Sequence, residues 1–87
     1  MNIHQQLVQD GDLLATGHDH AIIGILTSID KDGNEYRRVV YSIEKVLDGL
    51  EDQGMTGEEA QEWFDFNIDG AYAGPKTPVY IMERWND

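Results

Sequence analysis

Two neighbouring histidines are the first residues in this chain whose types and spacing could do chemistry. His18 and His20 are two positions apart, which on a strand would place both imidazoles on one face, a spacing that some metal sites use. His4 could supply a third ligand, but nothing in the sequence fixes its position. A polar loop that enters a strand explains the same residues, so we expect no metal ion and no cofactor.

A second candidate is the oxygen-rich segment Asp30–Glu35. Asp30, Asp32 and Asn34 alternate as the first ligands of an EF-hand loop do. The sixth position is Glu35 instead of glycine, and the twelfth is Tyr41 instead of a bidentate glutamate. A hairpin turn accounts for these residues, and calcium is not expected.

The third candidate is a row of carboxylates that recurs about once per helical turn. The row consists of Glu58, Glu62, Asp65 and Asp69. On a helix that begins at about Gly57 and ends near Ile68, these four side chains lie within roughly 60° of arc. Acid–base catalysis requires carboxylates in different, partly desolvated environments, and the outer face of a helix offers the opposite. The chain also has no Ser or Cys nucleophile motif and no phosphate-cradling glycine loop. We therefore expect a protein that is not an enzyme, with no catalytic residue.

The same row of carboxylates is a better candidate for binding a protein. Phe66 lies beside it with Trp63 nearby, and aromatic residues that border a charged patch are typical of protein interfaces. The expected contact residues are Glu58, Glu62, Asp65, Phe66 and Asp69. The alternative is that the first twenty residues fold over Phe66 as additional core.

The overall charge narrows the choice of partner. Seventeen acids and six bases give a net charge of −11, and eight acids but no bases lie between Val46 and Pro75. Direct binding to nucleic acid or to an anionic membrane is disfavoured, because both need basic clusters. A basic protein surface is favoured, including that of a host nucleic-acid-binding protein. In that case the chain would be a nucleic-acid mimic that inhibits a DNA-binding or host-defence complex. The alternative is that the acidity only keeps the protein soluble.

The elements that must position these residues begin with a β-hairpin. Ala21–Ile29 is apolar on both alternating faces and predicts a strand, in which Gly24 indicates a bulge. The segment 30–34 predicts a turn, and Glu35–Tyr41 a second strand.

Two helices and a strand follow the hairpin. Ser42 has N-cap chemistry, and the apolar residues after it repeat at helical spacing until Gly54 ends the helix. Thr56 and Glu59 match a capping box that starts the second helix. Thr77–Met82 predicts the last strand. The apolar face of the first helix comprises Ile43, Val46, Leu47 and Leu50, and that of the second comprises Ala60, Trp63, Phe64 and Ile68.

Asn67 breaks this pattern, because it falls in the middle of the apolar face of the second helix. A buried amide must satisfy its donor and its acceptor, so we expect Asn67 to bond backbone groups of the glycine-rich segment from Gly70 to Thr77. On this view it is an internal lock. The residues expected to have structural roles are Gly54, Thr56, Glu59, Asn67, Gly70 and Gly74.

These elements predict an α+β fold with a small, mainly antiparallel three-stranded sheet. Its order along the chain is β-hairpin, αα-hairpin and β-strand, with both helices packed on one face. We expect the strand at Ala21–Ile29 in the middle, and the last strand parallel to the first and antiparallel to the second. Residues 1–87 form a single domain, whose first twenty residues are poorly determined by the sequence. The uncovered sheet face and the free edges allow a further alternative, a self-assembling structural homodimer.

Several of these segments resemble a group of small uncharacterised proteins of phages and prophages. The resemblance covers roughly residues 19–82, and its most specific part is the run Phe-Asn-x-x-Gly-Ala at 66–71. The chain departs from the pattern at His20, Ser42 and Pro75, where the group has acidic residues. The resemblance implies an origin and no catalytic residue. The matching segments are Ala-Ile-Ile-Gly at 21–24, Val-Val-Tyr at 39–41, Gly-Met at 54–55, Glu-Glu-Ala at 58–60, Gly-Ala-Tyr at 70–72, Gly74 and Thr-Pro at 77–78.

The sequence also predicts where the protein acts. Cysteine is absent, the N-terminus has no signal-peptide pattern, and the longest apolar run, 21–26, is too short to cross a bilayer. We expect a cytoplasmic protein, which would act in the host cytoplasm if a phage encodes it.

Overall fold

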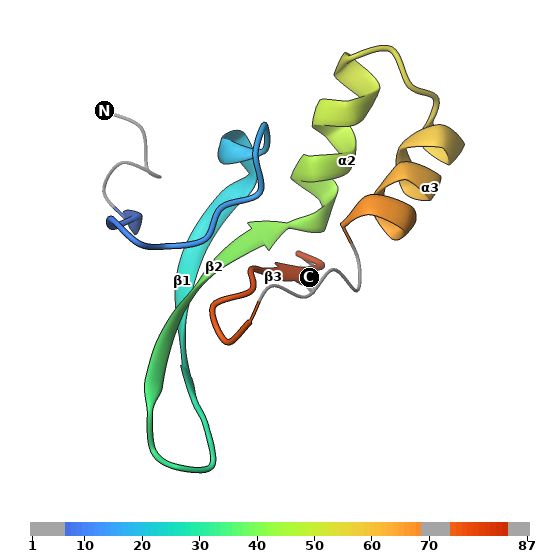
Figure 1. Ribbon diagram of the computed structural model, residues 1–87. Coiled ribbons are helices and arrows are strands. Elements are labelled where there is room, and N and C mark those ends of the chain that lie inside the picture. The colour runs from blue at the N-terminus through green and yellow to red at the C-terminus, as the bar shows by residue number, and fades with distance from the viewer. Residues whose placement is uncertain (1–6, 69–73, 84–87) are drawn as a thin grey trace, which may run out of the picture.

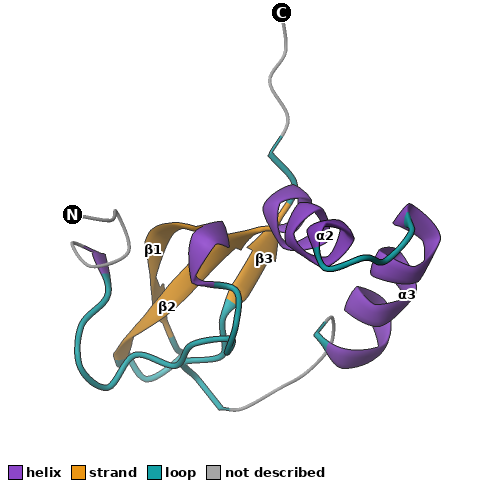
Figure 2. Ribbon diagram, turned by 90° about the horizontal axis from the view of Figure 1, so that it is seen from above, coloured by secondary structure: helices purple, strands orange, loops and turns teal. Residues whose placement is uncertain are grey.

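The computed structural model describes residues 7–68 and 74–83 (Figure 1). The chain forms a three-stranded mixed sheet with helices packed against it, which confirms the predicted α+β class. Seen from above, both longer helices lie on the same side of the sheet (Figure 2). The elements are η1 (Asp19–Ala21), β1 (Ile22–Ile29), β2 (Glu35–Ser42), α2 (Ile43–Asp52), α3 (Gly57–Asn67) and β3 (Val79–Ile81).

The predicted hairpin joins β1 and β2 through a turn organised by Asp30. Its carboxylate accepts backbone hydrogen bonds from Asp32 and Asn34, both at 2.9 Å. These bonds, with that from Asn34 first, hold the pKa of Asp30 below its usual value. Gly33 has φ +85°, a conformation that glycine adopts without steric cost.

The predicted bulge is present at the start of β1. Ile22 pairs with Tyr41 and Gly24 pairs with Val40, so the β1 side has one residue more than the β2 side. A bulge of this kind bends its strand and increases the local twist.

The strand order differs from the prediction. β2, not β1, is the central strand, and β3 pairs with it in parallel from Val40↔Val79 to Ser42↔Ile81. β1 is therefore an edge strand, although it is the most apolar one, and its Ile29 is 63 % exposed. The connection from α3 to β3 spans 68–78, and at about 3.3–3.6 Å per residue a segment of this length can reach either end of the sheet. The expectations that β1 is central and that the last strand runs parallel to it and antiparallel to the second strand were therefore wrong, because β3 runs parallel to β2 and so antiparallel in direction to β1.

Local signals define both helix starts and the tight turn between the helices. The Ser42 Oγ accepts a hydrogen bond from the Lys45 amide at 3.2 Å. The capping box forms as predicted: the Glu59 amide donates to Thr56 Oγ1 at 3.1 Å, and the Thr56 amide donates to Glu59 Oε1 at 2.8 Å. Gly54 has φ +107° and ends α2 in the left-handed region.

The core lies between the helices and one face of the sheet. Tyr41 is fully buried and stacks on Tyr80, with ring centroids 5.4 Å apart. Phe64 meets the Tyr80 ring edge-on at 5.6 Å, so α3 contacts β3 directly. The buried apolar residues are Ala21, Ile22, Val39, Tyr41, Val46, Leu50, Ala60, Phe64 and Ile68.

The segment before η1 is attached to this same face of the sheet. The Arg37 guanidinium donates to both carboxylate oxygens of Asp12 at 3.1 Å and to the Leu7 carbonyl at 2.7 Å. The Ala15 amide donates to the Tyr41 hydroxyl at 2.8 Å. Side-chain bonds from β2 therefore hold this segment in place.

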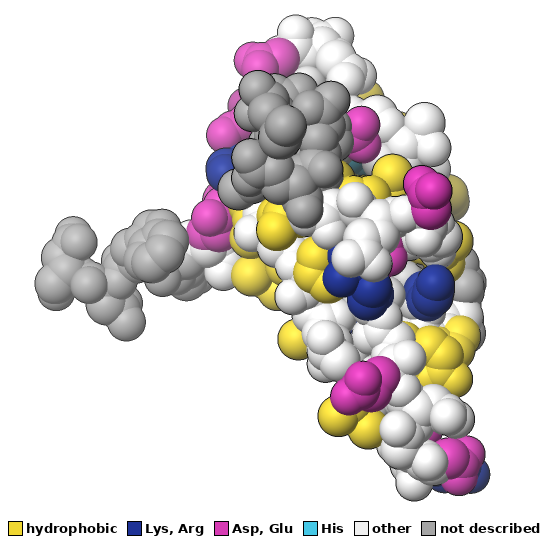
Figure 3. Space-filling model, turned by 90° about the vertical axis from the view of Figure 1, so that its left-hand side faces the viewer, with side chains coloured by type: hydrophobic (Ala, Val, Ile, Leu, Met, Phe, Trp, Pro, Cys, Tyr) yellow, Lys and Arg dark blue, Asp and Glu magenta, His cyan; other side chains and the backbone are white. Residues whose placement is uncertain are grey.

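The opposite face of the sheet carries apolar side chains that the core does not use. Strand alternation places Leu26, Val40 and Val79 on this face, and Leu26 is 44 % exposed. The left-hand side of the molecule in Figure 1 shows hydrophobic side chains next to Lys and Arg side chains (Figure 3). Two basic residues, Arg37 and Arg38, lie on β2, whereas α3 contains none.

Candidate protein-binding site

The carboxylates predicted to form a stripe on α3 are exposed where the structure describes them. Glu58, Glu62 and Asp65 all point to solvent, while Asp69 lies outside the described residues. Asp65 accepts a hydrogen bond from the Gln61 side chain at 2.9 Å. Within residues 7–68 and 74–83, Glu58 and Glu62 have no hydrogen bond or ion pair. Their charge is therefore available to a partner.

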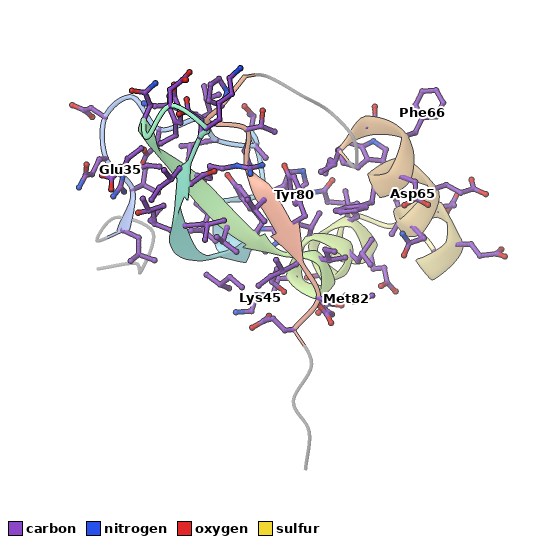
Figure 4. All side chains as sticks on the ribbon, turned by 90° about the horizontal axis from the view of Figure 1, so that it is seen from below. Glu35, Lys45, Asp65, Phe66, Tyr80 and Met82 are labelled. Carbon is purple, nitrogen blue, oxygen red and sulfur yellow. The ribbon has the colours of Figure 1, made fainter. Side chains whose placement is uncertain are left out.

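Phe66 is the most exposed large hydrophobic residue of the described chain, at 91 %. Its ring projects from α3 away from the sheet, whereas Tyr80 faces the space between the sheet and the helices (Figure 4). The alternative that the N-terminal segment covers Phe66 does not hold for residues 7–20, because Phe66 stays exposed while Leu7 and Ala15 bond to β2 and His18 contacts Trp63. A side chain that stays exposed gains little of the burial free energy that stabilises a fold.

A groove lies beside Phe66 on the outer surface of α3, and it is large enough to accept a side chain of a partner. It has a volume of about 380 Å³ and is lined by Met55, Glu59, Glu62, Trp63 and Phe66. The apolar lining comes from Met55 and the two aromatic rings, and the two glutamates border it. One oxygen of Glu59 is held by the Thr56 amide, so the capping box also orients a carboxylate at the groove.

The groove adds residues that sequence reasoning assigned to other roles. From the sequence, Trp63 is expected to face the core and Glu59 to cap the helix, and Met55 has no assigned role in binding. Both Met55 and Trp63 do pack against the core, and both are also partly exposed. The spacing of Glu59, Glu62, Trp63 and Phe66 is the i, i+3, i+4, i+7 pattern of one helix face, which is the signal that could have united them.

The two histidines near the sheet do not form a metal site with other described residues. The rings of His18 and His20 are 6.4 Å apart, and His20 Nε2 lies 3.0 Å from the Lys45 carbonyl oxygen. A Cβ at Gly49 would lie 2.5 Å from His20 Nε2, so this glycine leaves room for the imidazole against α2. Among the described residues, no group of three His, Asp or Glu side chains could hold a metal ion.

The prediction that Asn67 is a buried lock was wrong. Asn67 is exposed, and its side-chain amide donates to the Trp63 carbonyl of its own helix at 3.0 Å. Asn67 lines an open cavity instead of packing into the core. Gly70 lies outside the described residues. Gly74 has φ +97°, and its carbonyl accepts hydrogen bonds from the Thr77 amide at 3.1 Å and the Thr77 hydroxyl at 2.7 Å.

Asn67→Ala should therefore change the free energy of unfolding by no more than about 0.5 kcal/mol. The bond that it removes is exposed and lies within one helix, and alanine has a higher helix propensity than asparagine. Urea denaturation of the two proteins measures this difference. A loss of about 1–3 kcal/mol would instead restore the role of an internal lock.

None of the helices in the described ranges combines the length and hydrophobicity needed to cross a lipid bilayer. Comparisons with protein-family models, with curated proteins and with solved structures found no match to this chain.

Proposed function

We propose that this chain is a non-enzymatic binding protein whose α3 surface docks a basic segment of a partner protein. The observation that carries the proposal is Phe66, which is 91 % exposed at the edge of an apolar groove bordered by glutamates. Interfaces concentrate their binding energy in a few such aromatic anchors.

Charge complementarity selects the chemistry of the docked segment. α3 and the turn before it contain no base, and Glu58 and Glu62 have no partner among the described residues. A Lys or Arg side chain would place its aliphatic stem on Met55, Trp63 and Phe66 and its cation near Glu59 and Glu62. A segment that combines apolar residues with Lys or Arg therefore fits this groove best.

The proposal also covers the origin of the protein and the compartment in which it acts. The resemblance to phage and prophage proteins supports an accessory protein that acts in the cytoplasm of a host cell. The absence of cysteine is compatible with that reducing compartment.

A narrower version is that the partner is a nucleic-acid-binding protein and that the chain mimics nucleic acid. The eight acids between Val46 and Pro75, with no base among them, support this version. DNA added to the complex should then displace the chain. A complex that DNA leaves intact would reject mimicry and keep the protein-binding proposal.

Self-association is the second candidate, and the open face of the sheet supports it. Leu26 and Ile81 are 44 % and 41 % exposed, with Val40 and Val79 between them. Sedimentation velocity over a range of concentrations distinguishes the two candidates, because a monomer at all concentrations would eliminate the homodimer.

Phe66→Ala and Glu62→Lys should each weaken partner binding at least about 30-fold, the equivalent of about 2 kcal/mol. Affinity purification from host cells with the parent chain identifies the partner by mass spectrometry. Titration calorimetry with the purified partner then measures the loss, and binding should weaken as salt is raised.

Asp32→Lys is the matched control for Glu62→Lys. It makes the same charge reversal at an exposed site on the distant hairpin turn, so it should leave the affinity within about threefold. If Asp32→Lys weakened binding as much as Glu62→Lys, net charge and not the groove would explain the interaction. If Phe66→Ala left the affinity for the partner unchanged, that result would reject the proposed site.

A further inference from the structure

A second cavity shares Trp63 with the groove, and the proposed protein-binding role does not use it. Its volume is about 290 Å³. Three segments that are distant in sequence meet there: the segment before η1, the end of α3 and the start of β3 with the two residues before it. The lining residues are Leu14, Ala15, Thr16, His18, Trp63, Asn67, Ile68, Thr77, Pro78 and Tyr80.

Aromatic rings form a large part of the wall. The rings of His18 and Trp63 are 5.7 Å apart and tilted by 58°. Tyr80 is fixed by its stack on Tyr41 at 5.4 Å and by the edge contact with Phe64 at 5.6 Å. Rings held in this way offer offset and edge contacts to a planar guest.

His18 is a largely buried side chain whose ring contacts Trp63 but makes no hydrogen bond to another described residue. It is only 6 % exposed, and no hydrogen bond joins its ring to another residue in 7–68 or 74–83. Burial first, and the neighbouring His20 second, lower the pKa of His18, so its imidazole is neutral at neutral pH. A neutral imidazole presents one N–H donor and one nitrogen acceptor. No fully enclosed side-chain nitrogen or oxygen among the described residues lacks a hydrogen-bond partner, so the unbonded nitrogens of His18 still reach solvent and are accessible to a guest.

Tyr80 adds a second hydrogen-bonding group to the wall. Burial raises the pKa of Tyr80 to about 12, so its hydroxyl keeps its proton. That hydroxyl also has no hydrogen-bond partner in the described part of the chain. No Asp, Glu, Lys or Arg lines the cavity, and burying a charged guest without a counter-charge would be costly.

We propose that this cavity binds a small, neutral, planar heterocycle, with His18 as its hydrogen-bond partner and Trp63 and Tyr80 as its aromatic walls. This role goes beyond the docking of a partner on the outer side of α3. The two sites share Trp63, which lines both the cavity and the groove.

Three bicyclic probes of nearly equal shape test the proposal, with binding followed by amide chemical shifts in NMR titrations at pH 7.5. Indene has no hydrogen-bonding atom, indole has a donor, and benzimidazole has a donor and an acceptor. We expect saturable shifts at residues 14–18, 63–68 and 77–80. Affinity should rise from indene to benzimidazole by about three- to tenfold, the usual effect of one net hydrogen bond. Indole-2-carboxylate, which adds a charge, should bind more weakly than indole.

His18→Phe is the matched variant, because it keeps an aromatic ring and removes both nitrogens. Benzimidazole should lose its advantage over indene, while indene binds as before. A melting curve checks that the variant folds, and Tyr80→Phe provides a second test by removing only a hydroxyl. Equal affinity of all three probes for the parent protein would overturn the role of His18. The absence of shifts at the cavity residues, or shifts confined to Met55, Glu59 and Glu62, would overturn the site.

Discussion

Replacing Phe64 with alanine is expected to lower the free energy of unfolding by about 3–5 kcal/mol. The side chain is 3 % exposed and joins α3 to the sheet through its contact with Tyr80, so truncation leaves a cavity at that junction. A single domain of this size has a net stability of only about 5–10 kcal/mol. The variant should therefore be close to unfolding at room temperature, and urea denaturation measures the change.

Phe66→Ala is the matched control, because it removes the same side chain two positions along the same helix. Phe66 is 91 % exposed, and its removal should change stability by no more than about 0.5 kcal/mol. The two variants thus separate folding from binding. If Phe66→Ala were as destabilising as Phe64→Ala, the Phe66 ring would belong to the core, and its proposed role as an interface anchor would fail.

Arg37→Leu should have the second largest effect on stability, a loss of about 2 kcal/mol at pH 7. It removes a bidentate partner from Asp12, whose side chain is 2 % exposed, and the bond to the Leu7 carbonyl. We expect a smaller loss of stability than for a fully buried ion pair, because the Arg37 side chain is 33 % exposed. Chemical denaturation of Arg37→Leu, Asp12→Asn and the double variant isolates the coupling of the two side chains.

The Arg37 effect should depend on pH in a known direction. The hydrogen bond from Arg37 is the main cause that lowers the pKa of Asp12 below 3.8. A carboxyl with a lowered pKa stabilises the folded state above its unfolded pKa, and this contribution is lost as the pH falls through the folded value. The difference in stability between the parent and Arg37→Leu should therefore be largest above about pH 5 and should shrink below pH 3.8. A difference that stays constant from pH 7 to pH 3 would show that the ion pair does not stabilise the fold.

Much of the local structure could be predicted from particular residues. Ser42, Gly54, Thr56 and Glu59 defined where the helices start and end, and Asp30 with Gly33 defined the hairpin turn. These signals are reliable because each depends on hydrogen bonds between residues no more than four positions apart. Gly24 indicated the bulge in β1 for a similar reason, since a residue without a side chain tolerates an irregular ladder.

The candidate binding site was only partly predictable. Its acids and Phe66 follow from the helical periodicity of α3, which places them on the outer face. The groove does not, because it requires Met55 from the preceding turn to lie beside Trp63. Asn67 was misplaced for the same reason: the periodic pattern shows which way a side chain points, but not whether another segment covers it.

The sequence by itself determined the elements, their caps, the acidic outer face of α3 and the α+β class, all of which depend on short-range spacing. Only the tertiary structure decided that β2 is central, that the segment before η1 lies on the sheet, and that a cavity remains between His18, Trp63 and Tyr80. These features come from contacts between residues 16 or more positions apart, such as Arg37 with Asp12, Ala15 with Tyr41 and Phe64 with Tyr80. Their geometry depends on how several surfaces pack at once, and no local pattern records that outcome.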